Sequence, residues 1–109
     1  MKLLYHPTTD QITLAGVLYA LGDPARLNIV KLLATQGEQP CSAFNCDLAK
    51  STVSHHFKIL RESGVIFTRK FGTQHLNSLR QEELEERFPG VLNAVLSSCN
   101  AQIQEPASR

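Results

Sequence analysis

Apolar residues recur at helical spacing near the start of the chain, and their pattern predicts a first helix over about residues 9–21. They cover more than half of the circumference of that helix and comprise Ile12, Leu14, Ala15, Val17, Leu18 and Leu21. This apolar surface is wider than a helix packed on one side of a domain needs. We therefore expect a partner subunit to cover part of it.

A strong start signal for a second helix follows. Asp23 is placed as an N-cap, and Pro24 occupies the first helical position. Apolar residues then recur every three or four positions, and Gly37 predicts that the helix ends near Thr35. After a loop, a short helix is expected over residues 42–46, with the apolar side chains of Phe44 and Leu48 turned inward.

The pattern of residues 51–62 predicts a helix with one apolar and one polar side. Val53, Phe57 and Leu60 fall on one line, which we expect to face the core. His56 lies at the edge of that line and is interpreted as a packed residue. The opposite side carries two hydroxyls, an imidazole, a cation and a carboxylate, from Ser51, Ser54, His55, Lys58 and Glu62. Gly64 suits the position just after the helix.

Beyond Gly64 the spacing changes from helical to extended. β-branched and aromatic residues lie on either side of a glycine-containing loop at residues 69–73, which predicts a β-hairpin over residues 65–79. Arg69 and Lys70 are then expected near its tip. A hairpin of this kind beside a helix is a wing.

The last third of the chain predicts two more helical segments. Residues 81–87 form an acidic turn or two, and Pro89 opens a final helix that is expected to end near Cys99. The chain is therefore interpreted as one domain over residues 1–98, mainly α with a small β-hairpin (α+β), and a C-terminal tail over residues 99–109.

Length and composition exclude several classes of protein. A chain of 109 residues with 42% hydrophobic and 19% charged residues is typical of one globular domain. The longest nearly unbroken apolar stretch, residues 14–21, is far shorter than the roughly 18 residues that a membrane span needs. Residues 1–10 lack the apolar core of a secretory signal, so we expect a cytoplasmic protein. Because motifs for phosphate-binding loops, nucleophile elbows and metallohydrolase helices do not occur, we assign no enzymatic activity, catalytic residue or cofactor.

The net charge of +1 conceals an uneven distribution. Residues 1–49 carry −1, residues 50–80 carry +5, and residues 81–109 carry −3. The central excess arises because a single acidic residue, Glu62, stands against six cations: Lys50, Lys58, Arg61, Arg69, Lys70 and Arg80. Such an excess is expected of a surface that contacts phosphates, although a solvated basic face would have the same composition.

Together these features predict a DNA-binding surface. The major groove admits one α-helix, and a helix-turn-helix presents the first residues of its second helix to the base edges. We expect the wing to reach the flanking backbone or the minor groove. The predicted contacts are Lys50, Ser51, Thr52, Ser54, His55, Lys58 and Arg61 of the helix, with Arg69 and Lys70 of the wing.

Two motifs in order carry a family resemblance. The run LGDPARLNIVKLL at residues 21–33 and the run STVSHHFKILRESGV at residues 51–65 resemble the ArsR/SmtB family of winged helix-turn-helix transcriptional repressors. The resemblance covers about residues 9–98. It implies a homodimer formed by the first and last helices, with residues 51–62 as the recognition helix. It also implies repression of operator DNA that a metal, an oxidant or another signal relieves. Candidates for the dimer interface are then Leu14, Val17, Leu18, Leu92 and Val95.

The cysteines depart from the pattern of the metal-sensing members. Those members place a Cys-x-Cys pair before the recognition helix, whereas four residues separate Cys41 from Cys46 here. The last helix also lacks the histidines of a second family site, so no metal site is assigned. An odd number of cysteines in a reducing compartment predicts thiols. Buried thiols, a redox pair, and a soft metal or metalloid site formed with Cys99 stay open as alternatives.

The sequence leaves three functions in competition. The leading one is a homodimeric, sequence-specific DNA-binding repressor with an unidentified small inducer. A thiol-based metal, metalloid or redox sensor of the same family, using Cys41 and Cys46, is the second. A winged-helix module that binds a protein and no DNA is the third.

Overall fold

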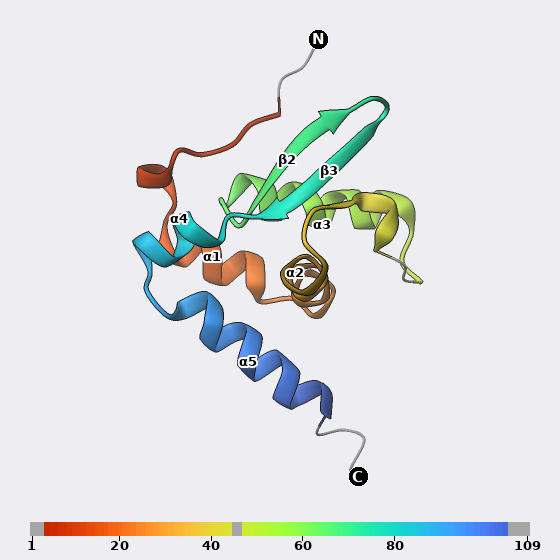
Figure 1. Ribbon diagram of the computed structural model, residues 1–109. Coiled ribbons are helices and arrows are strands. Elements are labelled where there is room, and N and C mark those ends of the chain that lie inside the picture. The colour runs from red at the N-terminus through yellow and green to blue at the C-terminus, as the bar shows by residue number, and fades with distance from the viewer. Residues whose placement is uncertain (1–3, 45–46, 105–109) are drawn as a thin grey trace.

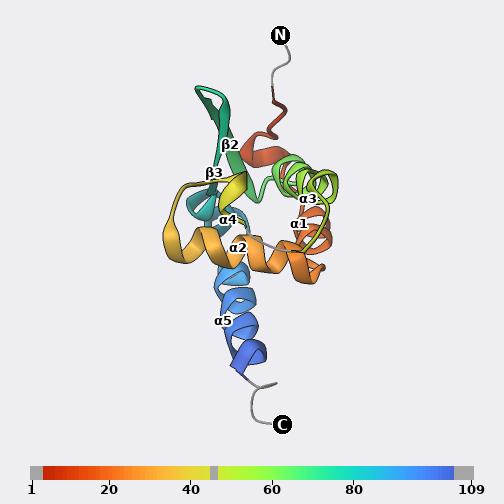
Figure 2. The same ribbon diagram turned by 90° about the vertical axis from the view of Figure 1, so that its right-hand side faces the viewer.

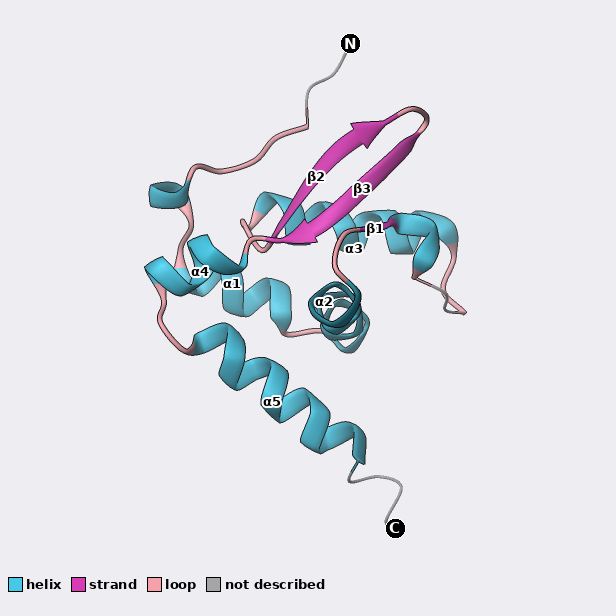
Figure 3. Ribbon diagram, viewed as in Figure 1, coloured by secondary structure: helices cyan, strands magenta, loops and turns pink. Residues whose placement is uncertain are grey.

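The computed structural model in Figure 1 describes residues 4–44 and 47–104, with side chains through Cys99. In chain order, the elements are η1 (Thr9–Gln11), α1 (Leu14–Leu21), α2 (Pro24–Gln36), β1 (Gln39–Pro40), η2 (Cys41–Ala43), α3 (Lys50–Glu62), β2 (Ile66–Phe71), β3 (Gln74–Leu79), α4 (Gln81–Arg87) and α5 (Val91–Gln104). Figure 3 shows helices around one small sheet, which confirms the mainly α fold with a wing.

The first α-helix begins later than predicted. Residues 9–11 form a separate 3₁₀ turn, and α1 starts at Leu14, where the Thr13 side chain accepts a hydrogen bond of 3.0 Å from the Gly16 N–H. The residue between the two segments explains the break. Ile12 is buried against Gly64, which has a φ of +89° and where a Cβ would lie 2.5 Å from Ile12 Cγ1. A packing contact 52 positions away along the chain therefore overrides the local helical pattern.

The second helix follows its sequence signals closely. The Asp23 carboxylate accepts hydrogen bonds of 2.9 and 3.2 Å from the N–H groups of Ala25 and Arg26. At the other end, Gly37 has a φ of +77°, a conformation that glycine adopts at little cost. Both predicted boundaries of α2 are thus confirmed to within one residue.

The sheet has three antiparallel strands in the order β1-β3-β2, one more than predicted. Strand β2 continues through Arg69 and Lys70 to Phe71, so the wing turn contains only Gly72 and Thr73. The predicted five-residue loop was wrong because the charged residues pair along the edge strand rather than forming the turn.

The segment before α3 also differs from the prediction. The short helix expected over residues 42–46 is a 3₁₀ turn at Cys41–Ala43, and residues 45–46 lie outside the described residues. Phe44 packs against the core as expected, in an edge-on contact with Phe57 whose ring centroids are 6.4 Å apart. Leu48, in contrast, is 43% exposed and was wrongly predicted to turn inward.

The core lies where α1, α2 and α3 meet the base of the wing. Helix α3 contributes Phe57 and Leu60, which are both nearly fully buried, while Val53 is half-buried at its margin. His56 is also buried, as its position beside this line predicted. Because α3 packs against the core through one side, its opposite side faces outward.

The wing and α5 lie at opposite ends of the molecule, as Figures 1 and 2 show from two directions. Helix α4 matches its predicted bounds. Helix α5 starts at Val91 and continues to Gln104, five residues past the end expected near Cys99. None of the helices within the described ranges is both long and apolar enough to cross a bilayer.

Candidate nucleic-acid interface

The polar side of α3 forms an exposed face that we call the recognition face. It consists of Ser51, Ser54, His55, Lys58 and Glu62, all of which are exposed. Thr52 is exposed beside it, and Arg61 is half-buried near the end of the helix. Its hydroxyls, imidazole and cation can donate to or accept from base edges and phosphates, and the Glu62 carboxylate lies at the end of the helix.

The start of α3 favours an anion. The N-cap residue Ala49 makes no side-chain hydrogen bond, and the first turn contains no acidic residue. The first N–H groups of a helix have no partner within it, and they carry the positive end of the helix dipole. With the exposed Lys50 beside them, they form a surface that suits a phosphate.

The two faces of the wing carry different cations. Lys70 pairs directly with His75 across the sheet. Both belong to the face whose inner positions, Ile66, Thr68 and Asn77, are buried against the rest of the domain. Lys70 is therefore an exposed cation near the tip, on the helix-facing side of the wing.

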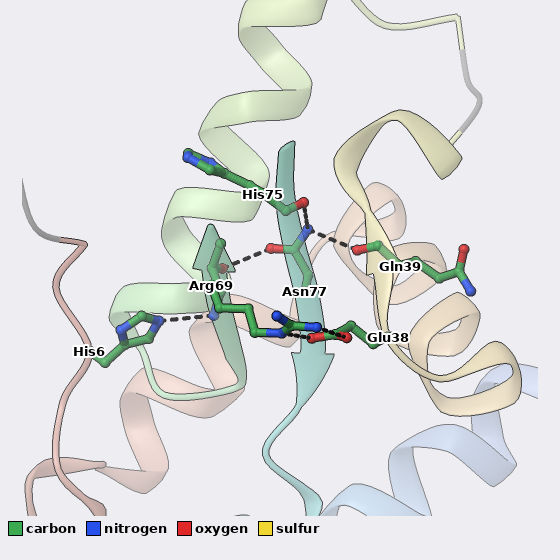
Figure 4. A network of polar contacts seen from close by, with 7 residues as sticks. His6, Glu38, Gln39, Arg69, His75 and Asn77 are labelled. Carbon is green, nitrogen blue, oxygen red and sulfur yellow. Dashed lines mark hydrogen bonds and ion pairs between the residues drawn. The ribbon is translucent and has the colours of Figure 1, made fainter. Parts of the chain in front are cut away.

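Arg69 projects from the other face of the wing. Its guanidinium donates hydrogen bonds of 2.8 and 3.0 Å to the two carboxylate oxygens of Glu38, as Figure 4 shows. The hydrogen bond from Arg69 lowers the pKa of the Glu38 carboxyl. The same guanidinium lies 5.6 Å from the centroid of the Phe71 ring. The charge of Arg69 is thus already paired within the protomer.

Arg80 is also kept from binding phosphates, because it is buried and paired within the protomer. It is 8% exposed, and its guanidinium donates to both carboxylate oxygens of Glu83 at 2.8 and 3.1 Å. A third hydrogen bond, of 2.8 Å, reaches the carbonyl of Pro7. Of the six cations between residues 50 and 80, two are therefore neutralised by carboxylates from outside that segment.

A concavity brings the start of α3 and the wing turn together. It has a volume of about 580 Å³ and lies between η2, the first turns of α3 and the hairpin tip. Lys50 and Ser54 line it from the helix, and Thr73, Gln74 and His75 line it from the wing. Two of the predicted helix contacts thus lie beside Thr73, Gln74 and His75, which were not among the predicted wing contacts.

A buried asparagine fastens the wing to the preceding segment. The Asn77 amide accepts a hydrogen bond of 2.7 Å from the Thr68 hydroxyl and donates one of 3.2 Å to the carbonyl of Gln39 (Figure 4). It also lies 3.4 Å from the sulfur of Cys41. Asn77 is fully buried, and a polar residue in a strand gave no sequence signal for this role.

The N-terminal arm holds the outer edge of the wing. His6 Nε2 accepts a hydrogen bond of 3.0 Å from the Thr68 N–H (Figure 4). The His6 ring also stacks on Phe67, with the two ring centroids 4.5 Å apart. Burial lowers the pKa of His6, and the nearby positive charges of Arg61 and Arg80 lower it further. No local sequence pattern pairs this histidine with a strand residue 62 positions away.

Two of the three cysteines lie among the residues that the structure describes. Cys41 is half-buried and Cys99 is buried, and Cys46 lies outside the described residues. Over residues 4–44 and 47–104, no three His, Cys, Asp or Glu side chains are grouped so that they could hold a metal ion.

The predicted dimer residues divide into two groups. Leu14 and Leu18 are 43% and 50% exposed on α1, and Val95 is half-buried. Val17 and Leu92, in contrast, belong to the core of the protomer and offer almost no surface to a partner. Their burial within the protomer leaves Leu14, Leu18 and Val95 as the predicted interface residues with surface that a partner could contact.

A shallow groove accompanies the exposed leucines. It lies between α1, the start of α2 and α5, and it has a volume of about 330 Å³. Its lining is largely apolar and consists of Leu18, Leu21, Leu27, Ala94, Val95, Ser98 and Cys99. This end of the molecule therefore differs in chemistry from the recognition face.

Comparisons with known proteins agree with this geometry. The family described as "Bacterial regulatory protein, arsR family" matches residues 23–67, from the N-cap of α2 into β2. An uncharacterized HTH-type transcriptional regulator, YceK of Bacillus subtilis, is 37% identical over 89 residues, which cover 79% of this chain and 88% of that protein. The arsenical resistance operon repressor of Staphylococcus xylosus is 34% identical over 73 residues, covering 66% of this chain and 70% of that one.

A solved structure shows the same fold. The ArsR family transcriptional regulator RHA00566 superimposes with a TM-score of 0.61 at 24% sequence identity. The match covers 88% of this chain and 97% of that chain, so it extends well beyond the helix-turn-helix.

Proposed function

This chain belongs to the ArsR family of bacterial regulatory proteins, and from that membership we propose that it is a homodimeric repressor that binds operator DNA through α3 and the wing. In this proposal α3 enters the major groove with the recognition face toward the bases. The wing turn lies over the flanking backbone or the minor groove.

The observation that carries the proposal is the first turn of α3. Its N–H groups have no side-chain cap, the first turn holds no carboxylate, and Lys50 lies beside it. A helix start of this kind is completed by a phosphate. The concavity shared with Thr73 and His75 would then receive the DNA backbone between the helix and the wing.

Individual cations have different parts in this proposal. Lys58 on the recognition face and Lys70 near the wing tip have no salt-bridge partner among the described residues, so they are available to phosphates. Arg69 instead holds β2 to Glu38, and we expect it to contribute less to binding than the sequence alone suggested.

The second copy is proposed to cover α1 and α5. Two-fold pairing would place Leu14 and Leu18 of each copy against an apolar surface, together with the groove beside them. It would also present two recognition faces to one duplex. Half-sites one helical turn apart would then match the symmetry of the protein.

Fluorescence anisotropy at several salt concentrations tests the proposal. The wild type should bind a duplex from the promoter region beside its own gene, with a preference over a scrambled duplex of equal length. Lys58→Ala should weaken binding to both duplexes and reduce the slope of log affinity against log salt by about one. Ser54→Ala and His55→Ala should instead relax the preference at particular base pairs.

Lys31→Ala is the matched control, because Lys31 lies on α2 and outside the proposed interface. It should leave the affinity and the salt slope close to those of the wild type. Equal binding of the promoter and scrambled duplexes by the wild type would contradict the proposal. It would favour the alternative in which the winged helix binds a protein.

A further inference from the structure

One buried cation joins three helices at the centre of the protein. Arg26 comes from the first turn of α2 and is 7% exposed. Its guanidinium lies where the end of α1 meets the middle of α3. The proposed repressor activity assigns no role to this residue, and Arg26 lies outside the basic segment, residues 50–80, which carries the excess positive charge.

Two of its hydrogen bonds go to the end of α1. Arg26 Nε donates to the carbonyl of Ala20 at 2.6 Å, and an Nη2 hydrogen donates to the carbonyl of Tyr19 at 3.2 Å. The last carbonyls of a helix have no partner within it and carry the negative end of its dipole. Arg26 therefore caps α1 with a charge of the appropriate sign.

The third hydrogen bond goes to α3. Arg26 Nη1 lies 3.2 Å from His56 Nδ1, and both groups are buried. Since arginine can only donate, Nδ1 must be the acceptor and the imidazole proton sits on Nε2. That nitrogen faces the Asp23 carboxylate at 3.9 Å. The network thus runs from α1 through α2 to the buried side of α3.

This contact differs in kind from the others that hold α3. Phe57 and Leu60 seat the helix through apolar burial, which has no preferred donor–acceptor angle. Among the hydrogen bonds of residues 4–44 and 47–104, the Arg26–His56 pair is the one between a side chain of α3 and a side chain of another element. Hydrogen bonds weaken steeply as their angles depart from linear, so this pair resists rotation.

We propose that Arg26 is a positioning residue for DNA recognition, because its bond to His56 fixes the rotation of α3 relative to α1. The proposal rests on the proposed DNA-binding function. His55, the residue before His56, is exposed on the recognition face. Holding His56 in one orientation therefore also sets the direction in which His55 and its neighbours meet the bases.

The arrangement also connects the two functional ends of the protein. Arg26 holds the last carbonyls of α1, and α1 carries the exposed Leu14 and Leu18 of the proposed dimer surface. The rotation of each recognition helix is thus fixed relative to α1, the helix proposed to meet the partner subunit. Both recognition faces would then be fixed within one dimer.

A matched pair of substitutions at His56 tests the proposal. His56→Leu fills the site but removes the acceptor, whereas His56→Asn keeps an acceptor oxygen at the same distance along the side chain as Nδ1. We expect His56→Leu to lose about tenfold in affinity for the promoter duplex and less than twofold for the scrambled duplex. His56→Asn should recover most of the promoter affinity. Arg26→Lys keeps the charge but cannot reach three acceptors, and it should reproduce the selective loss.

A second measurement does not depend on DNA. Hydrogen exchange of the backbone amides should accelerate in α3 of His56→Leu and remain unchanged in α5, while His56→Asn should resemble the wild type. If the wild type shows no preference for the promoter duplex, the proposed function fails, and the exchange data still test the contact between Arg26 and His56. Equal losses on both duplexes in parallel with a lowered melting temperature would overturn the positioning role, as would failure of His56→Asn to restore the preference.

Discussion

The two ends of this protein expose opposite chemistry. At the wing end, the recognition face and the wing turn present hydroxyls, imidazoles and cations around an uncapped helix start. At the far end, α1 and α5 present Leu14, Leu18 and a shallow apolar groove. Figure 2 shows how far apart the wing tip and α5 lie.

The difference indicates two kinds of partner. A charged face binds phosphates through interactions that salt weakens, whereas an apolar face binds another apolar surface through burial. The proposed function needs both, because the apolar end would pair two copies and the polar ends would meet the DNA. Substitutions that affect one end without the other can test this division.

The largest effect is expected at the apolar end. Leu18→Glu places a charge where the partner would bury a leucine, and two-fold symmetry introduces the defect twice. Because burial of each leucine contributes about 1.5–3 kcal/mol and the dimer loses two, the dissociation constant of the dimer should increase by more than about 100-fold. Analytical ultracentrifugation should detect monomers, and affinity for the promoter duplex should fall with dimerisation.

Asn28→Glu adds the same charge to an exposed position of α2 and serves as the control. It should leave the sedimentation behaviour unchanged. An unchanged dimer in Leu18→Glu would show that the apolar end does not pair the two copies.

The next effect separates a structural cation from a binding cation within the basic segment. Arg80→Ala removes three hydrogen bonds from a buried guanidinium, and the free energy of unfolding should fall by about 2 kcal/mol. Thermal denaturation should show a melting temperature several degrees below that of the wild type. Lys70→Ala should leave the melting temperature unchanged and weaken DNA binding. The reverse pattern would contradict the division between these two cations.

A smaller effect is expected from pH at the wing end. Burial lowers the pKa of His6 in the folded protein, so the unfolded chain binds more protons as the pH falls below about 6.5. The stability that the His6 contact provides is present above this pH and is lost as the pH falls through the folded-state pKa. His6→Gln keeps an acceptor for the Thr68 N–H but does not titrate.

Urea unfolding at pH 7.5 and pH 5.5 measures this difference, since both values lie above the range in which carboxylates titrate. The wild type should lose more stability between the two conditions than His6→Gln does. Identical losses in the two proteins would show that His6 does not sense protons in the folded state.

Local signals account for the parts of the fold that the sequence predicted well. Asp23, Pro24 and Gly37 define α2, and Gly64 ends α3, because capping depends on neighbours within a few positions. The polar side of α3 was also predictable, since helical periodicity alone places Ser54 and Lys58 opposite the buried line.

Contacts between distant residues account for the rest. Ile12 leaves the first helix to pack on Gly64, and Arg69 pairs with Glu38 from 31 positions away. Arg80 appeared to be a surface cation, whereas burial against Pro7 makes it structural. No local pattern distinguishes a cation that binds phosphate from one that has an internal partner.

Hydroxyl-radical footprinting of the promoter duplex is the most direct test of the claim that a dimer presents two recognition faces to one duplex. The wild type should protect two segments on the same side of the duplex, with their centres one helical turn or a whole number of turns apart. Leu18→Glu should lose both protected segments at the protein concentration that gives full protection by the wild type. A single protected segment, or protection that is the same on a scrambled duplex, would contradict the account.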